Sequence, residues 1–197
     1  MALAPIEPAL GLLELESIAA GIEAGDAMVK RAPVEVLRAG TVHPGKYLVL
    51  VGGDVAEVEE ALEEGQAVGG LAVRDVTFLA NIHPAVVEAV RGTRQGAQAE
   101  ALGIIETATV PAVIRAADAG IKGAQVRLLE LHLADDLGGK GYLLFDGPVT
   151  DVEAAVAIGA AAVGDARGLH TRVIAQLHAE MAQELAADGR FASRVKG

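Results

Sequence analysis

Apolar runs separated by glycine, proline and charged residues divide this chain into short elements. The apolar run at residues 9–15 predicts a buried strand. After it, Ile18, Ile22 and Val29 recur at helical spacing, which predicts a helix with these side chains on one face. Ser17 is placed to cap this helix and Pro33 to end it near Arg31.

The rest of the first half continues the alternation. A strand is expected from Val34, a turn-rich break over residues 41–45, and a strand at 47–51 whose continuous apolar character is typical of burial on both faces. A helix should follow Asp54 and end at Gly69-Gly70, with its glutamates facing solvent. Residues 71–79 predict a fourth strand, and His83-Pro84 predicts the start of a short helix that reaches Val90.

The second half repeats this order, and its sequence repeats as well. Residues 9–30 aligned with 101–122 give 10 identities in 22 positions, and residues 45–62 aligned with 139–156 give 8 in 18 after a two-residue insertion. A period of this length indicates a duplicated small domain. The predicted second-half elements are strand 101–107, helix 110–123, strand 125–134, strand 141–145, helix 149–163, strand 168–176 and helix 178–187.

Two α/β domains therefore follow one another, each β-α-β-β-α-β plus a terminal helix, which is ferredoxin-like wiring. We predict domain boundaries at 1–91 and 101–187, a linker over 92–100 and a flexible tail over 188–197. The net charge of −11 argues against nucleic acid as a partner. No apolar run approaches the ~20 residues of a membrane span, so we expect no membrane association and a cytoplasmic protein.

The sequence shows no strong catalytic pattern. The chain lacks cysteine, and its five histidines are not arranged in any metalloenzyme motif. The segment Gly138-Gly139-Lys140-Gly141 lacks the spacing and the Ser/Thr of a phosphate-binding loop, and Asp135-Asp136 is an adjacent pair more typical of a solvated loop. We therefore expect a protein that is not an enzyme.

Several ordered motifs nevertheless resemble the bacterial microcompartment shell domain. They are Leu10 to Glu14, Ala24 to Lys30, Pro44 to Lys46 and Gly53 to Val58, with counterparts in the second half at Leu102 to Glu106, Ala116 to Ala119 with Lys122, Gly139-Lys140 and Val149 to Val152. Two fused, unpermuted copies resemble the tandem-domain trimeric class, above all its propanediol-utilisation members. The resemblance implies a homotrimer that mimics a hexameric tile and packs edge to edge with other shell proteins.

The resemblance also implies where the tile edge and the pore lie. In the family the lysine of the first helix lies at the edge, which carries over to Lys30 and Lys122. The family's edge motif corresponds to Asn81 and His83 in the first copy and to Gln176 and His178 in the second. The turn after the second strand lines the pore, and the corresponding residues here are His43, Pro44 and Gly45 and, in the second copy, Asp135, Asp136, Leu137, Gly138 and Gly139.

The pore is where this chain departs from its propanediol-type relatives. They carry a cysteine at the position of His43, and three such cysteines hold an iron–sulfur cluster, so no cluster is expected in a chain without cysteine. Three His43 side chains could instead ligate a divalent metal, or could form an unliganded, weakly polar lining. We favour the unliganded lining.

The leading hypothesis is thus a structural shell protein that passes small metabolites through a central pore. The alternative is a trimeric ligand-binding regulatory module, because small domains of this wiring also serve as effector sensors and a fold alone does not determine function.

Overall fold

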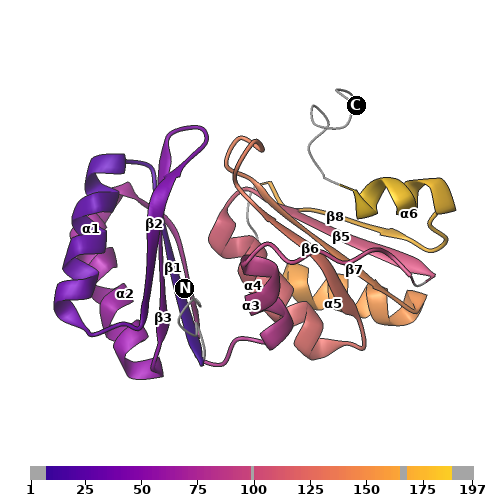
Figure 1. The fold of residues 1–197 in the computed structure, drawn as a ribbon, viewed down its shortest axis with the longest axis horizontal. Helices are drawn as coiled ribbons and strands as arrows, with labels where there is room; N and C mark the ends of the chain where they lie inside the picture. Colours follow the sequence, from indigo (N-terminus) through magenta and orange to yellow (C-terminus); the bar gives the residue numbers. More distant parts are fainter. Residues whose placement is uncertain (1–7, 99, 165–167, 188–197) are drawn as a thin grey trace.

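The computed structural model describes residues 8–98, 100–164 and 168–187 and contains two domains side by side, each with one four-stranded antiparallel sheet (Figure 1). The strand orders are β2-β3-β1-β4 and β6-β7-β5-β8, so the two sheets have the same topology. The elements of the first domain are β1 (Ala9–Leu15), α1 (Ile18–Arg31), β2 (Val36–Val42), β3 (Lys46–Gly53), α2 (Val55–Gly69), the 3₁₀ turn η1 (Gly70–Ala72), β4 (Val73–Leu79) and α3 (Pro84–Val90).

The second domain repeats this order with little change. Its elements are β5 (Ala101–Thr107), α4 (Val110–Gly123), β6 (Arg127–Leu133), β7 (Gly141–Gly147), α5 (Val149–Val163), β8 (His170–Ile174) and α6 (Ala179–Ala186). The predicted order β-α-β-β-α-β plus a terminal helix is confirmed in both domains. The predicted tail from residue 188 onward lies outside the described residues.

Strand β1 lies between β3 and β4, and both of its faces are buried. Leu13 and Leu15 pack under α1 and α2 against Met28 and Leu62, whereas Leu10 and Leu12 face the second domain. This two-sided burial is what the apolar run at residues 9–15 predicts. The matched Gly11 and Gly103 let the helices approach closely, since a Cβ would lie 2.6 Å from Leu62 at Gly11 and 2.7 Å from Val156 at Gly103.

The predicted helix starts are confirmed by their caps. The Ser17 hydroxyl accepts a hydrogen bond from the Ala20 N–H, the Asp54 carboxylate accepts one from the Ala56 N–H, and His83 Nδ1 accepts one from the Ala85 N–H at 3.1 Å. These short polar groups satisfy N–H groups that have no partner within their own helix.

Two details of the sequence prediction are wrong. Thr41 and Val42 belong to β2, so the break contains only residues 43–45. Leu71 belongs to η1 and is fully exposed, because the strand begins only at Val73. The predicted helix with Ile18, Ile22 and Val29 on one face is confirmed as α1, but that face is exposed, because the smaller residues Ala24 and Gly25, together with Met28, pack on the sheet.

One of the apolar clusters spans both domains, whereas a second lies within the first domain under α1 and α2. Helices α1 and α2 cover the outer face of the first sheet, and α3 and α4 lie between the two sheets (Figure 1). Val86 and Val87 of α3 pack in one cluster with Leu12 of the first sheet and Leu131 of the second domain. The short helix predicted to close the first unit therefore joins it to the second.

Candidate functional site

The seam between the domains is built around the buried carboxylate of Glu14. This side chain is 0% exposed, and Lys46 Nζ on β3 donates to its Oε1 at 2.6 Å. Its Oε2 accepts a hydrogen bond from the Val110 N–H, the first residue of α4, at 2.8 Å. A carboxylate from one domain thus binds the N-terminus of a helix in the other, where the helix dipole favours negative charge.

Burial has an electrostatic consequence at Glu14. Removing the carboxylate from water raises the pKa of Glu14, and the hydrogen bonds from Lys46 and the Val110 N–H partly offset that rise. A buried ion pair is costly to break, because one partner is left charged and unpaired.

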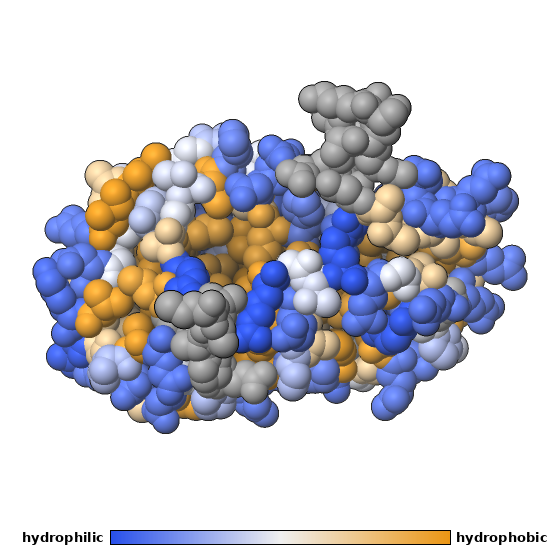
Figure 2. All heavy atoms as spheres, in the orientation of Figure 1, coloured by the Kyte–Doolittle hydropathy of each residue, from blue (hydrophilic) through white to orange (hydrophobic). Residues whose placement is uncertain are grey.

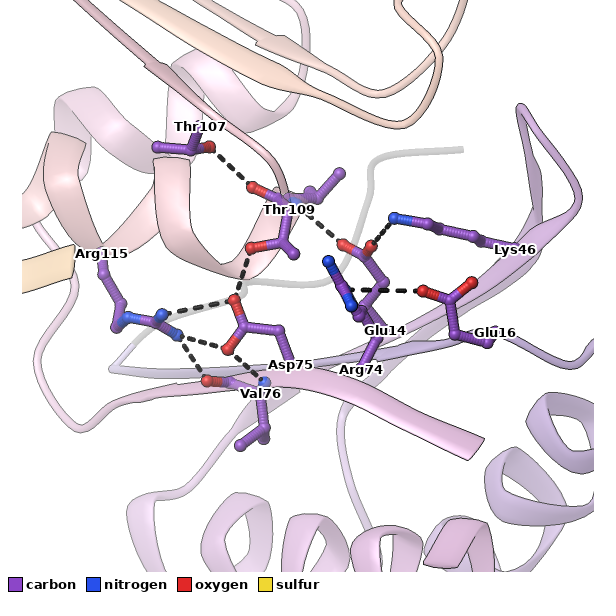
Figure 3. A network of polar contacts seen from close by, with 10 residues as sticks. Glu14, Glu16, Lys46, Arg74, Asp75, Val76, Thr107, Thr109 and Arg115 are labelled. Atoms are coloured by element: carbon purple, nitrogen blue, oxygen red, sulfur yellow. Dashed lines mark hydrogen bonds and ion pairs between the residues drawn. The ribbon is translucent and has the colours of Figure 1, made fainter. Parts of the chain in front are cut away.

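A second carboxylate of the first domain continues the seam (Figure 3). Asp75 on β4 accepts a hydrogen bond from the Thr109 hydroxyl at 2.5 Å and pairs with Arg115 on α4, whose Nη1 lies 3.2 Å from Oδ1. Arg115 Nη1 also donates to the Val76 carbonyl. The strand ends and the first two turns of α4 are thereby fixed to each other.

At the other end of α4, the structure brings together three of the residues that the resemblance assigns to a tile edge. Lys122 Nζ donates to the Asn81 carbonyl and pairs with Asp118 Oδ2 at 2.6 Å. Asp118 Oδ1 also accepts the His83 N–H at 2.8 Å. Lys122, Asn81 and His83 therefore meet where the first domain contacts the second.

The remaining predicted edge residues lie apart from this group. Within the described part of the chain, Lys30 pairs only with Asp26 on its own helix, at 2.5 Å, and both side chains are exposed. Gln176 and His178 are exposed at the far end of the second domain, where His178 caps α6. By the repeat, Lys30 corresponds to Lys122, Gln176 to Asn81 and His178 to His83.

The two predicted pore turns lie against each other. The break after β2 holds His43, Pro44 and Gly45, whereas the corresponding loop between β6 and β7 spans residues 134–140 and contains the two-residue insertion. A Cβ added at Gly139 would lie 3.0 Å from the His43 carbonyl oxygen and 3.2 Å from Pro44, so the loops are in contact. Asp135 and Asp136 are exposed in this loop, and His132 Nε2 lies 3.2 Å from the Asp135 carbonyl.

The seam leaves an apolar groove between the domains, visible as an orange hollow in Figure 2. Its volume is about 400 Å³, and its walls come from Leu48 and Leu50 of β3, Val90 of α3, and Val110 and Ile114 of α4. Among the described residues, no group of three or more His, Asp or Glu side chains is placed to hold a metal ion. None of the helices in the described part of the chain is long and apolar enough to cross a membrane.

The exposed face of the second sheet carries the same polar groups as the seam. Glu106 and Lys140 stand at the positions of Glu14 and Lys46 and form the same ion pair at 2.6 Å, but Glu106 is 36% exposed. Together with Ile104 and Tyr142 they line an open pocket on the second sheet. None of the described helices of the first domain covers Glu106 and Lys140 in the way that α4 covers Glu14 and Lys46.

Comparison with known proteins identifies this architecture. The model of the BMC domain matches twice, at residues 9–82 and 101–177. The chain belongs to the BMC-domain family. It is 41% identical to the bacterial microcompartment shell protein PduT of Citrobacter freundii over 179 residues, which are 90% of this chain and 97% of that protein. It is therefore a microcompartment shell protein with two tandem domains.

Solved structures agree with the family assignment. A microcompartment protein from Desulfitobacterium hafniense is similar with a TM-score of 0.75 and 39% identity, covering 89% of this chain and 98% of that one. A fused permuted hexameric shell protein of the RMM microcompartment shares the fold at a TM-score of 0.54 and 20% identity, over 78% and 82% of the chains. The BMC-domain chain described here keeps its strands in unpermuted order.

Sequence reasoning singled out Lys122, Asn81 and His83 but missed the polar groups at the other end of the seam. Glu14 and Glu106 were a usable signal, because each is a charge within an apolar strand and the two match across the repeat. Asp75 and Arg115 gave none, since they do not match between the copies.

Proposed function

We propose that three copies of this chain close into a flat ring of six domains that occupies one hexagonal position in a microcompartment shell. The observation that carries the proposal is that the groups buried at the seam inside the chain recur, exposed, at its two ends. A contact of one surface with a different one repeats head to tail, and it yields a closed ring when the rotation closes. Six equivalent domains correspond to three chains.

The polar groups support this arrangement. Inside the chain, Glu14 accepts the N–H of Val110, and the repeat places Glu106 and Ile18 at the equivalent positions. In the ring, Glu106 of one copy therefore accepts the N–H of Ile18 of the next. Asp26 and Lys30 likewise take the roles of Asp118 and Lys122 and bind the backbone around Gln176 and His178 of the neighbouring copy.

The apolar surface supports it equally. Ile22 is 56% exposed, whereas Ile114, its counterpart at the seam, is 0% exposed. Met181 is 50% exposed, whereas Val86, its counterpart on α3, is 0% exposed. Ile18 and Leu37 are exposed at the same end of the chain as Ile22. The chain therefore has two exposed apolar patches at opposite ends, one with Ile22 and one with Met181. Such patches are typical of protein–protein interfaces, here between two copies of the chain.

The centre of the ring receives three copies of each turn. Residues 43–45 alternate with residues 135–139 around the axis, because the two loops already touch in one chain. We propose a pore lined by His43 and by the acidic loop for the passage of small metabolites, without a bound metal or iron–sulfur cluster. Soaking crystals with zinc tests this: an anomalous peak on the axis at His43 would contradict the unliganded pore.

The role is structural rather than catalytic, and the ring edges meet other shell proteins in the shell layer. Sedimentation velocity of the purified chain combined with electron microscopy tests the proposal. We expect a species of three times the 20.1 kDa chain mass that forms sheets, tubes or mixed shells. A discrete protein that binds a metabolite and never assembles with shell proteins would favour the regulatory module instead.

A further inference from the structure

At one pair of seam positions, the two domains carry groups of opposite type. Within the chain, Arg115 on α4 pairs with Asp75 on β4. The repeat aligns Glu23 on α1 with Arg115. The strand registers align His170 with Asp75, because Asp75 is paired with Glu14 and His170 with the equivalent Glu106. The helix position is the cation Arg115 in the second domain and the anion Glu23 in the first. The strand position changes the other way, from the anion Asp75 in the first domain to His170 in the second.

The other polar positions of the seam do not change type. Glu14 matches Glu106, Lys46 matches Lys140, and the pair Asp118–Lys122 matches Asp26–Lys30. Against this background of identity at two ion pairs, the exchange at the third pair is specific. Glu23 and His170 are both exposed, and no hydrogen bond or ion pair joins either side chain to another described residue.

We propose that, in the ring described above, Glu23 of one copy accepts a hydrogen bond from the His170 imidazole of the next, as the inverted counterpart of the Arg115–Asp75 pair. This inference rests on the proposed ring. The groups that surround His170 there are Glu106 on β5 and Lys140 on β7 of its own copy, and Ser17 and Glu23 of the copy that docks on it.

The inversion fixes which domain can lie against which. The incorrect seams could form only if domains were swapped between copies, because α4 already covers the first sheet within each chain. With α1 in place of α4 on the first sheet, Glu23 would face Asp75, and two carboxylates would be buried together. With α4 on the second sheet, Arg115 would face His170 and would lack its carboxylate. Both incorrect seams are penalised, whereas the alternating order satisfies all four groups. The pair therefore specifies the order of the domains as well as contributing to the contact.

A charge exchange tests this pairing. Uniformly ¹⁵N-labelled trimers are mixed with unlabelled trimers, and native mass spectrometry follows the formation of trimers that contain both labelled and unlabelled chains. Glu23→Arg alone and His170→Asp alone should each speed subunit exchange at least about tenfold, because one charged group at the seam loses its partner. The double variant recreates the Arg115–Asp75 pair in kind and should return the rate to within about threefold of the unmodified chain.

Glu63→Arg is the matched control, since Glu63 is exposed on α2 and the charge change is the same. Its exchange rate should be that of the unmodified chain. Circular dichroism of each variant checks folding, which should be unaffected because both residues are exposed in the single chain. Trimers whose single variants exchange like the control, or whose double variant stays fast, would overturn the pairing and leave the ring intact. An unmodified chain that never forms trimers would instead overturn the ring itself.

Discussion

The carboxylate of Glu14 joins three elements that are far apart in the sequence. It lies on β1, its cation Lys46 on β3 and its N–H donor Val110 on α4. The sequence predicted the strand correctly because strand burial follows from local apolar character. It could not predict the ion pair, since the partners come together only when the second domain docks.

Removing Lys46 tests the importance of this pair to stability. Lys46→Met should lower the free energy of unfolding by about 3 kcal/mol, because the carboxylate of Glu14 stays buried without its cation. Lys140→Met is the matched control, and at concentrations where the chain is monomeric it should cost no more than about 1 kcal/mol, since that pair is exposed. Urea unfolding measures both. Equal losses in the two variants would contradict the difference in burial.

The raised pKa of Glu14 gives a pH dependence of known sign. The folded chain binds the Glu14 proton more tightly than the unfolded chain does, whose value is near 4.5. The stabilisation from this proton is therefore complete below 4.5 and is lost as the pH rises through the folded pKa. Relative to Glu14→Gln, the unmodified chain should gain stability as the pH falls from neutral towards 4.5.

Urea unfolding at a series of pH values measures this difference, with Glu63→Gln as the exposed control. A difference between the unmodified chain and Glu14→Gln that stays constant over this range would contradict the raised pKa, and so would a loss of stability relative to that variant.

At the scale of elements, helix α1 shows where prediction from periodicity stops. The spacing of Ile18, Ile22 and Val29 correctly indicates a helix with one apolar face, but not what covers that face. In α4 the same face is buried by the neighbouring domain, and in α1 it is exposed. Periodicity indicates an apolar surface, and in the proposed ring the partner of that surface is the second sheet of the next copy.

Matched substitutions on these two helices separate assembly from folding. Ile22→Asp should prevent trimer formation while leaving the melting temperature of the monomer nearly unchanged, because Ile22 is exposed in the single chain. Ile114→Asp should destabilise the chain by more than about 3 kcal/mol, since it buries a charge in the shared core. Sedimentation velocity and thermal melting measure the two effects. Trimers of unaltered stability with Ile22→Asp would show that α1 lies outside the subunit interface.

The loop between β6 and β7 carries the charge of the proposed pore. Asp135 and Asp136 are exposed in each copy, so six carboxylates would surround the axis of a trimer. Anions should therefore pass more slowly than matched neutral or cationic solutes, and Asp135→Asn with Asp136→Asn should reduce the difference. Solute uptake by reconstituted shells measures this. Equal passage of matched anions and cations through the unmodified pore would contradict it.

For the whole molecule, duplication explains both what could be predicted and what could not. The matched segments predicted two domains of one topology, and the structure places the two unequal loops in contact, which the sequence did not indicate. The way the domains share a core was not predictable, because α3 was expected to close the first domain and instead packs in the seam. Which residues serve the tile edge and the pore stays a prediction for the assembled ring.

The proposed ring requires the seam inside the chain to recur between chains. A crystal structure of the protein shows whether it does. We expect a ring of three copies in which the Glu106 carboxylate of one copy lies within hydrogen-bonding distance of the Ile18 N–H of the next. A monomer, a two-fold dimer, or a trimer that leaves Glu106 and Ile22 exposed would contradict it.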